Sequence, residues 1–483
     1  MNKVSIQQLL DVGIALSREK NSDSLFERIL TTAMDITNCD GGTLYSKDGE
    51  FLKFKFMVTK SKHIKKGGKS GKITLPPVPL SPKNVCSQAA LSGKLINIAD
   101  VYTSETYDFT NPKSYDAMMH YRTMSMLVVP MEDDKGGCIG VLQLINALNE
   151  QGDIIPFDSS CEPVILSLAS QTAIFTTNMN YAVEVRELLD SLVRVMSTAI
   201  DARTPYNANH TRNMVKYADH FISWLNKSEN KWNFNERERR QFIMSVWLHD
   251  AGKLTVPLEI MDKETRLGNH LATVLERFRI IALIHKIEWQ SGIQNDSEYA
   301  ASQTELARAR ELILKVNEVG YLQDELVEEI NALAQKTYID EEGIPQPWLT
   351  NMEQTYLSVR RGTLTSEERG VMESHVTMTA TMLQEVKFPS DYAMVPIWAG
   401  EHHEFLNGTG YPQGLKEKDI PREVRLLTIL DIFDALTARD RPYKAGMPAE
   451  KAFTILQSMQ AEGKLDATVL QLFFDSHVWE ETE

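Results

Sequence analysis

The chain has 483 residues, of which 42% are hydrophobic and 24% are charged, and its formal net charge at pH 7 is −15. Because this length exceeds one ordinary hydrophobic core, we expect two or three domains. The negative balance gives no long-range attraction to a polyanion, which excludes a general DNA- or RNA-binding protein, and any phosphate ligand must meet local cations.

The start of the chain and its cysteines indicate the compartment. Residues 1–20 carry polar side chains every few positions, and no uninterrupted apolar run is long enough to cross a bilayer, so we expect neither a signal peptide nor a membrane span. The cysteines lie without the spacing of a zinc ribbon, which is typical of reduced thiols. We therefore expect a cytoplasmic protein whose free thiols are Cys39, Cys86, Cys138 and Cys161.

The region from about residue 22 to 178 alternates short strand-like runs with helices. Leu25, Ile29 and Ala33 are spaced four apart and predict a helix. A second helix is predicted through Val164 and Ile174. Between them, β-branched and alternating apolar residues predict strands at 42–45, 52–56, 125–130 and 140–146.

This mixed pattern resembles a GAF domain, an α+β small-molecule sensor that often precedes signalling enzymes. Members that bind cyclic nucleotides carry a dispersed Asn-Lys-Phe-Asp-Glu motif. Asn146, Phe157 and Glu162 match that motif, whereas Ala147 and Cys161 stand at its lysine and acid positions. We therefore interpret the region as a dimerisation or sensing module for an unidentified small molecule, rather than as a cyclic-nucleotide site.

The segment 179–200 is predicted to be a helix that connects the GAF-like domain, residues 1–178, to the rest of the chain. An apolar stripe on such a helix is typical of core packing, but it could also form a parallel two-helix seam, which would make the protein a homodimer. The stripe consists of Leu188, Leu189, Leu192, Val195, Met196 and Ala199.

Histidines and carboxylates gather in short motifs along the remaining region, residues 201–483. His249 and Asp250 end an apolar run, with Lys253 one turn later, and adjacent His402 and His403 lead into a glycine-rich turn. Neutral imidazole and carboxylate are ligands of iron, manganese and zinc. For any one of these histidines a structural role in the core is the more common reading, so the joint pattern is what indicates a metal site.

These motifs together resemble the HD-GYP family, bacterial metal-dependent phosphodiesterases that hydrolyse cyclic di-GMP and related cyclic dinucleotides. The match runs from about residue 185 to 460. It implies an all-α HD-type domain that holds two divalent ions, iron or manganese with zinc as the alternative, bridged by Asp250. The implied metal ligands are His210, His249, Asp250, His375, His402, His403 and Asp431.

The resemblance also implies how the ligands divide. Tyr206 replaces the glutamate that supports a third ion in some members, which favours a binuclear centre. On an ideal helix His402 and His403 would point about 100° apart, so both could reach an ion only across their shared edge. His210, His249 and Asp431 would lie near one ion, and His375, His402 and His403 near the other.

Catalytic and substrate-binding roles follow from the same resemblance. Asp250 and Lys253 are the implied catalytic residues, with Lys253 facing the substrate phosphate as a point charge. Arg441 and Lys444 are candidates for the second phosphate, although one residue is added before Arg441 relative to the usual family spacing. Tyr411, in the glycine-rich turn, could contact the dinucleotide or a protein partner.

Asp250 and His375 are much farther apart than in the family, which predicts an insertion at about residues 265–358. Apolar stripes at 306–316 and 322–333 predict a helical hairpin within it. Because the insertion lies between two ligand-bearing segments, we expect either a lid or partner surface over the metal cleft, or a solvated addition away from it.

The sequence therefore predicts a GAF-regulated phosphodiesterase that hydrolyses cyclic di-GMP to linear pGpG, to GMP or to both. Two cations can lower the pKa of a shared water and neutralise the phosphate charge during such a reaction. One alternative is a catalytically silent scaffold that binds metal and dinucleotide. Another is a phosphohydrolase of a different nucleotide, because metal ions recognise phosphate and not the base.

Overall fold

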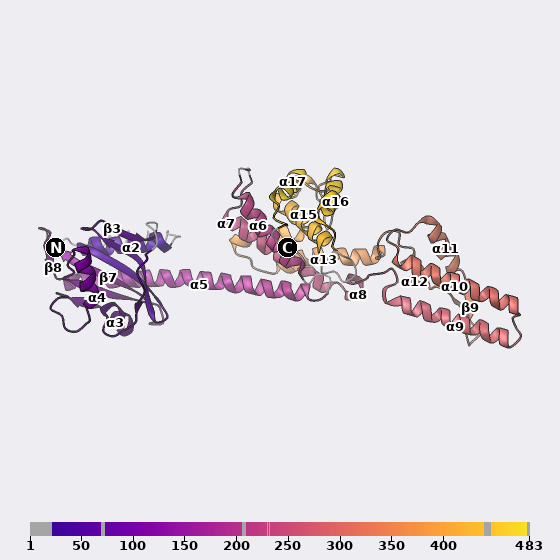
Figure 1. The fold of residues 1–483 in the computed structure, drawn as a ribbon, viewed down its shortest axis with the longest axis horizontal. Helices are drawn as coiled ribbons and strands as arrows, with labels where there is room; N and C mark the ends of the chain where they lie inside the picture. The colour runs from indigo at the N-terminus through magenta and orange to yellow at the C-terminus, as the bar shows by residue number, and fades with distance from the viewer. Residues whose placement is uncertain are drawn as a thin grey trace. The chain divides into compact units, whose positions relative to one another are not determined.

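The structure is a computed structural model, which divides the chain into two compact units, residues 1–188 and 189–483. The division falls inside one long helix, α5 (Glu162–Asp201) (Figure 1). Among the described residues, no helix combines the length and apolarity needed to cross a bilayer. The structure describes residues 22–68, 73–204, 209–228, 230, 232–438 and 446–480.

An antiparallel sheet forms the centre of the first unit, with strand order β3-β2-β1-β7-β6-β5. The short strand β4 pairs with β2, and β8 pairs with β7. The strands predicted at 42–45, 52–56 and 140–146 lie within β1, β2 and β7, whereas the strand predicted at 125–130 begins one residue before β6. The bounds are β1 (Cys39–Asp48), β2 (Phe51–Thr59), β3 (Ile64–Gly67), β4 (Val78–Pro79), β5 (Ile96–Ile98), β6 (Met126–Glu132), β7 (Cys138–Leu148) and β8 (Ile154–Ile155).

The two faces of this sheet build separate cores, because successive side chains of a strand point in opposite directions. Leu127 and Val129 of β6 pack with α2 (Ser22–Ile36) and the first part of α5. Met126 and Val128 face the other side and pack with α3 (Val85–Ser92). The remaining elements of the unit are α4 (Thr110–Met119) and the 3₁₀ helix η2 (Ser159–Cys161).

The helix predicted through Val164 and Ile174 and the predicted connector are one continuous helix, α5, of 40 residues. No glycine or proline follows Pro163 within it, so nothing in the backbone interrupts the helix. Its apolar stripe is largely solvent-exposed, with Leu192 52% and Val195 66% exposed.

Helices packed around an aromatic core form the second unit outside the insertion. Phe221, Phe433 and Phe473 are each at most 1% exposed and lie at the centre of this core. The helices are α6 (His210–Leu225), α7 (Glu236–Leu248), α8 (Leu258–Met261), α13 (Ser366–Gln384), α14 (Val395–Gly400), α15 (Arg422–Thr437), α16 (Ala449–Ala461) and α17 (Ala467–Ser476), with 3₁₀ helices η3 (Ala251–Thr255), η5 (Ser390–Tyr392) and η6 (Glu417–Asp419).

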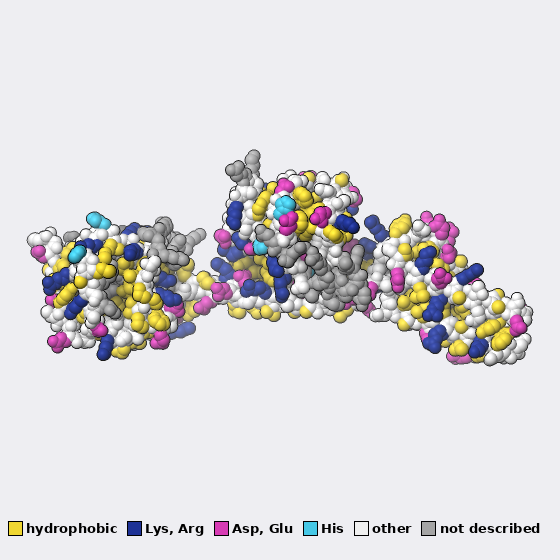
Figure 2. Space-filling model, viewed as in Figure 1, with side chains coloured by type: hydrophobic (Ala, Val, Ile, Leu, Met, Phe, Trp, Pro, Cys, Tyr) yellow, Lys and Arg dark blue, Asp and Glu magenta, His cyan; other side chains and the backbone are white. Residues whose placement is uncertain are grey.

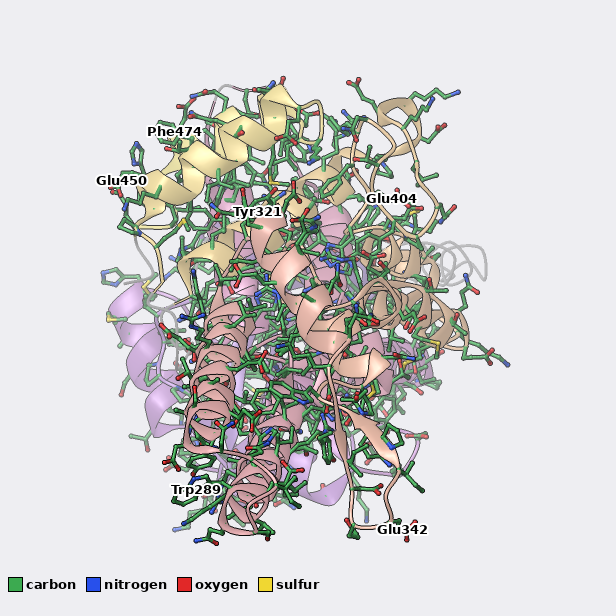
Figure 3. All side chains as sticks on the ribbon, turned by 90° about the vertical axis from the view of Figure 1, so that its right-hand side faces the viewer. Trp289, Tyr321, Glu342, Glu404, Glu450 and Phe474 are labelled. Carbon is green, nitrogen blue, oxygen red and sulfur yellow. The ribbon has the colours of Figure 1, made fainter. Side chains whose placement is uncertain are left out.

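Residues 268–357 form an insert with a hydrophobic core of its own, which includes Phe278, Ile313 and Ile330. The predicted hairpin corresponds to α10 and α11, whereas α9 and a two-stranded ladder were not predicted. Figure 3 labels Trp289 at the end of α9 and Glu342 in the turn of the ladder. The elements are η4 (Gly268–His270), α9 (Leu271–Gln290), α10 (Asp296–Glu318), α11 (Asp324–Ala334), β9 (Thr337–Ile339), β10 (Pro345–Pro347) and α12 (Asn351–Leu357).

Two arginines hold the insert in place, one just before it and one inside it. The guanidinium of Arg266, which is fully buried, donates to the carbonyl oxygens of Val316, Val319 and Val359. Inside the insert, Arg277 pairs with the buried carboxylate of Glu353. On the visible face of the insert, hydrophobic and oppositely charged side chains are interspersed (Figure 2).

Candidate metal centre

The seven predicted metal ligands converge in the second unit, although they come from five segments of the chain. His210 begins α6, and His249 and Asp250 follow α7. His375 lies within α13 and Asp431 within α15, while His402 and His403 follow α14. Six of the seven are at most 8% exposed as whole residues, and His403 is partly exposed.

One group forms around His210. Its Nε2 lies 3.3 Å from Nε2 of His249 and 3.3 Å from Oδ1 of Asp431. Oδ2 of Asp250 lies 3.6 Å from Nε2 of His210 and 3.2 Å from Nε2 of His249. These separations suit donor atoms that surround one ion, because metal–ligand bonds of about 2 Å place neighbouring donors about 3–4 Å apart.

A second group contains His375, His402 and His403, whose candidate ligand atoms all lie within 4.8 Å of one another. Oδ1 of Asp250 lies 3.4 Å from Nε2 of His375. Asp250 therefore directs one carboxylate oxygen to each group. Asp431 lies between the groups as well, because its Oδ2 is 3.7 Å from Nδ1 of His403.

Three imidazoles are oriented by the carbonyl three residues earlier in the chain. A carbonyl oxygen can only accept, so each Nδ1 must carry the proton and each Nε2 must present a lone pair. The Nδ1 atoms of His249, His375 and His402 donate to the carbonyls of Val246, Met372 and Ala399, at distances of 2.8, 2.6 and 2.7 Å.

Two of these imidazoles have a buried lone pair without a partner, and this feature fits a metal ion. Nε2 of His402 and Nε2 of His375 are buried and have no hydrogen-bond partner among the described residues. A buried acceptor without a partner costs free energy, and a divalent ion would satisfy it. The nitrogen and oxygen donor set, without thiolate, suits iron, manganese or zinc.

The electrostatics keep most of the ligands in the form that binds a cation. Burial lowers the pKa of His403 to about 4 and holds the pKa of His402 well below its ordinary value, so both are neutral at pH 7. Burial opposes ionisation of Asp250, but His249 and Lys253 outweigh it and its pKa is lowered. For His210, burial lowers the pKa, but the neighbouring carboxylates outweigh it and raise the pKa to about 10.

A close contact between η3 and α13 brings the two groups together. A Cβ atom on Gly252 would lie 1.9 Å from the carbonyl oxygen of His375, so only glycine allows this approach. The hydroxyl of Thr379 accepts from the amide of Gly252 at 2.8 Å and donates to the carbonyl of His249 at 3.0 Å. A bulkier residue at position 252 would separate the segments that carry the predicted ligands.

His402 and His403 do not lie on a helix, so the separation of about 100° that an ideal helix would impose does not apply to them. α14 ends at Gly400, and the two histidines lie in the turn that follows it. Because the helix has ended, their rings approach to 4.2 Å between centroids with an interplanar angle of 40°. Both imidazoles therefore face the same group of donors.

Of the four residues predicted to bind the substrate, the structure describes two, Lys253 and Tyr411. Nζ of Lys253 lies 2.5 Å from Oδ2 of Asp250, and the ring of Tyr411 lies 4.8 Å from the ring of His403. Both side chains therefore border the centre. Arg441 and Lys444, and also Tyr206, lie outside the described residues.

Sequence reasoning missed two carboxylates that support the centre. Oδ2 of Asp434 lies 2.7 Å from Nδ1 of His210, and Asp434 is 1% exposed. Glu404, labelled in Figure 3, accepts from the amides of Gln413 and Leu415 and so holds the glycine-rich turn. The available signal was an acidic residue one helical turn after Asp431 and another beside the histidine pair.

The first unit contains a cavity of about 490 Å³ lined largely by apolar and aromatic side chains, among them Tyr45 and Phe54. Asn146, Phe157 and Glu162, which match the nucleotide-binding motif, are not among its lining residues. Their observed contacts are with other residues of the first unit and stabilise its fold. The side chain of Asn146 accepts from one backbone amide and donates to a carbonyl, Phe157 is in the core, and Glu162 accepts from Asn97.

Comparisons with known proteins agree with this architecture. The family model of the GAF domain matches residues 21–175, and that of the HD domain matches residues 350–469. The chain therefore carries an N-terminal GAF domain followed by a helical HD domain, which confirms the resemblance drawn from the sequence.

Three curated relatives match shorter segments. A "3'3'-cGAMP-specific phosphodiesterase 3" of Vibrio cholerae is 40% identical over 96 residues, which are 20% of this chain and 20% of that protein. A "Cyclic di-GMP phosphodiesterase" of Thermotoga maritima is 39% identical over 107 residues, covering 22% and 28%. A cyclic di-GMP phosphodiesterase of Pseudomonas aeruginosa is 33% identical over 152 residues, covering 32% and 33%. The matched segments thus span at most a third of these relatives.

Proposed function

We propose that the chain is a metal-dependent phosphodiesterase that hydrolyses a cyclic dinucleotide, with cyclic di-GMP as the first substrate to test and pGpG, GMP or both as products. The observation that carries this proposal is the convergence of seven imidazole and carboxylate groups on one buried centre, with Asp250 facing both halves. The names of the similar proteins support the substrate class.

The chain's own residues would act on the substrate as follows. His210, His249 and Asp431 would hold one ion, and His375, His402 and His403 the other, with Asp250 between them. Two bound divalent ions, iron or manganese, would supply an acidified water and neutralise charge on the phosphate.

Two side chains at the border of the centre would position the substrate. Lys253 is 19% exposed at its side chain, so its ammonium can turn from Asp250 to a phosphate oxygen. Tyr411, beside His403, offers an aromatic face and a hydroxyl to the dinucleotide.

A second substrate is favoured by a specific observation. Three similar proteins are named for 3'3'-cGAMP rather than for cyclic di-GMP. The centre recognises the phosphates that both dinucleotides share, so 3'3'-cGAMP is the alternative substrate.

The test uses the purified full chain, reconstituted with ferrous iron or manganese in the absence of oxygen and offered each dinucleotide. We expect linear product from the parent and none from Asp250→Ala. Asp466→Asn is a matched control, because Asp466 is a partly buried acid in the same unit that pairs with Arg425. Binding without turnover in the parent would instead show a scaffold, and equal turnover in Asp250→Ala would reveal a contaminant.

We propose further that the chain is a homodimer through α5. Along this helix the residues at three- and four-residue spacing form one heptad face, with Asn178 at the first core position. A polar asparagine at one such position specifies a parallel pair in register. The other positions of the face are Tyr181, Val185, Leu188, Leu192 and Val195, which are 41%, 57%, 59%, 52% and 66% exposed.

Light scattering of the full chain tests the dimer. We expect twice the chain mass of 54.8 kDa for the parent and a single chain mass for the double variant Val185→Glu and Leu192→Glu. Val183→Glu is the control, because Val183 is similarly exposed, at 47%, but lies on the opposite side of the heptad. A parent of single mass, or a double variant that stays dimeric, would exclude this seam.

We propose finally that a small molecule in the cavity of the first unit regulates hydrolysis. Thr59, at the end of β2, lines the cavity, so Thr59→Trp should fill it and alter the rate of turnover without altering metal content. Unchanged rates would exclude regulation from this cavity.

A further inference from the structure

We propose that the two metal positions are unequal, and that Asp434 makes the position formed by His210, His249 and Asp431 bind its ion first and more tightly. Asp434 would act as a positioning residue through His210, without touching the ion. This inference rests on the proposed function, since it presumes that the centre binds two ions.

The contact that carries the inference is short and buried. Oδ2 of Asp434 lies 2.7 Å from Nδ1 of His210, and both residues are at most 8% exposed. A carboxylate can only accept a hydrogen bond, so Nδ1 carries a proton and Nε2 is the atom that faces the ion position. A carboxylate behind a metal-binding imidazole fixes the ring and raises its basicity.

Three of the other imidazoles have a neutral acceptor in the place of this carboxylate. Nδ1 of His249, His375 and His402 each donates to a neutral backbone carbonyl. A neutral acceptor polarises the ring less than a charged one. His210 is therefore the stronger donor among these four, and it belongs to only one of the two groups.

The other charged residues at the centre do not favour metal binding by one group over the other as clearly as Asp434 does. Asp250 directs one oxygen to each group, and Lys253 neutralises part of its charge on the side of His210. Asp431 faces His210 through Oδ1 and His403 through Oδ2. Of these three carboxylates, Asp434 is the one whose observed contact is with a single group, the group around His210.

The test is a manganese titration of the full chain after removal of metal by a chelator. Bound ions are counted by equilibrium dialysis with elemental analysis, and paramagnetic resonance distinguishes single from coupled manganese. For the parent we expect two steps, with a signal of isolated manganese before the coupled one. A single step in which both ions bind with equal affinity would overturn the inference.

Asp434→Asn isolates the role of the charge, because the amide oxygen can still accept from His210. Loss of an outer carboxylate costs about 10- to 100-fold in metal affinity, so the first step should weaken by that factor while the second stays in place. Asp466→Asn should change neither step. An unchanged first step, or equal weakening of both steps, would refute the role of Asp434.

If Asp434→Asn does not fold, two variants that each lack one predicted ligand provide a second test. His375→Ala should keep the tight step and lose the weak one, whereas His210→Ala should lose the tight step. The reverse order would overturn the inference. If the parent binds no manganese, the proposed function fails as well, whereas equal affinities with normal turnover would refute the inequality alone.

Discussion

Gly252→Ala should pull the two halves of the metal centre apart. The added Cβ would lie 1.9 Å from the carbonyl oxygen of His375 and 2.6 Å from the amide nitrogen of Thr379. Both contacts are backbone atoms, which cannot rotate away. An ordinary contact begins at 3.4 Å, so η3 and α13 must separate by about 1.5 Å, the difference between 3.4 and 1.9 Å.

That movement is large compared with what a metal ion tolerates. Oδ1 of Asp250 and Nε2 of His375 lie 3.4 Å apart, and the same displacement would bring them to roughly 5 Å if directed along the line that joins them. Two ligands of one ion, each about 2.1 Å from it, cannot be more than about 4.2 Å apart. The ion at the His375 position should therefore lose one ligand.

Stability should fall together with metal content. Overpacking costs about 1–3 kcal/mol, and loss of the hydrogen bond from Gly252 to Thr379 adds about 1 kcal/mol. In a domain of 150–250 residues each kcal/mol lowers Tm by about 2–4 °C, so we expect a decrease of several degrees. Thermal unfolding and elemental analysis of the purified variant measure the two effects.

Gly370→Ala provides the control on the same helix α13. No atom lies within 4 Å of the Cβ that it would add, so the helix should gain up to about 1 kcal/mol from the better propensity of alanine. The reasoning would be refuted if Gly252→Ala retained both ions and the parent Tm, or if Gly370→Ala were as damaging.

Two further predictions concern the insert. Burial opposes ionisation of Glu353, but hydrogen bonds from Arg277 outweigh it and lower its pKa, so the pair stabilises the fold above the unfolded pKa of about 4.3. Stability should be lost as pH falls through the lower folded pKa, and Glu353→Gln should remove this dependence in unfolding experiments between pH 7 and pH 3. Replacement of residues 268–357 by a short glycine-serine linker should leave metal content unchanged, because the observed partners of the centre lie outside the insert; loss of both ions on elemental analysis would contradict this.

Helices and strands were predictable from the sequence wherever their apolar residues had a clear period or followed one another without interruption. The strands at 125–130 and 140–146 were found because both of their faces are buried. Helix α9 was missed because it is apolar on several sides: Val274 and Ile281 are buried, whereas Leu283 and Ile287 are about 60% exposed. Such a segment has no single stripe to reveal its period.

The residues that gather at the centre were predictable from residue type and motif, but the contacts that support them were not. His210 and Asp434 lie far apart in sequence, and only the packing of α6 against α15 brings them into contact. The partner of Gly252 on α13 could not be identified from sequence either. Contacts between distant segments depend on tertiary packing, which short motifs do not encode.

The position of the insert raises the question of how the centre tolerates it. The insert leaves the helices of the second unit after Asp250 and returns to them before His375, so strain at the junction would reach both halves of the centre. Contacts between residues that precede the insert and residues that follow it hold the junction together. The ammonium of Lys263 lies 2.7 Å from Glu368, and the hydroxyl of Thr363 donates to the carbonyl of Lys263 at 2.9 Å.

These contacts tie the junction of the insert to a helix of the metal centre. Lys263 and Glu368 are both largely buried, and Glu368 belongs to α13, the helix that carries His375. Removal of one partner from a buried ion pair costs about 3–5 kcal/mol. The centre should therefore depend on this junction more than on the distant end of the insert, where Trp289 lies.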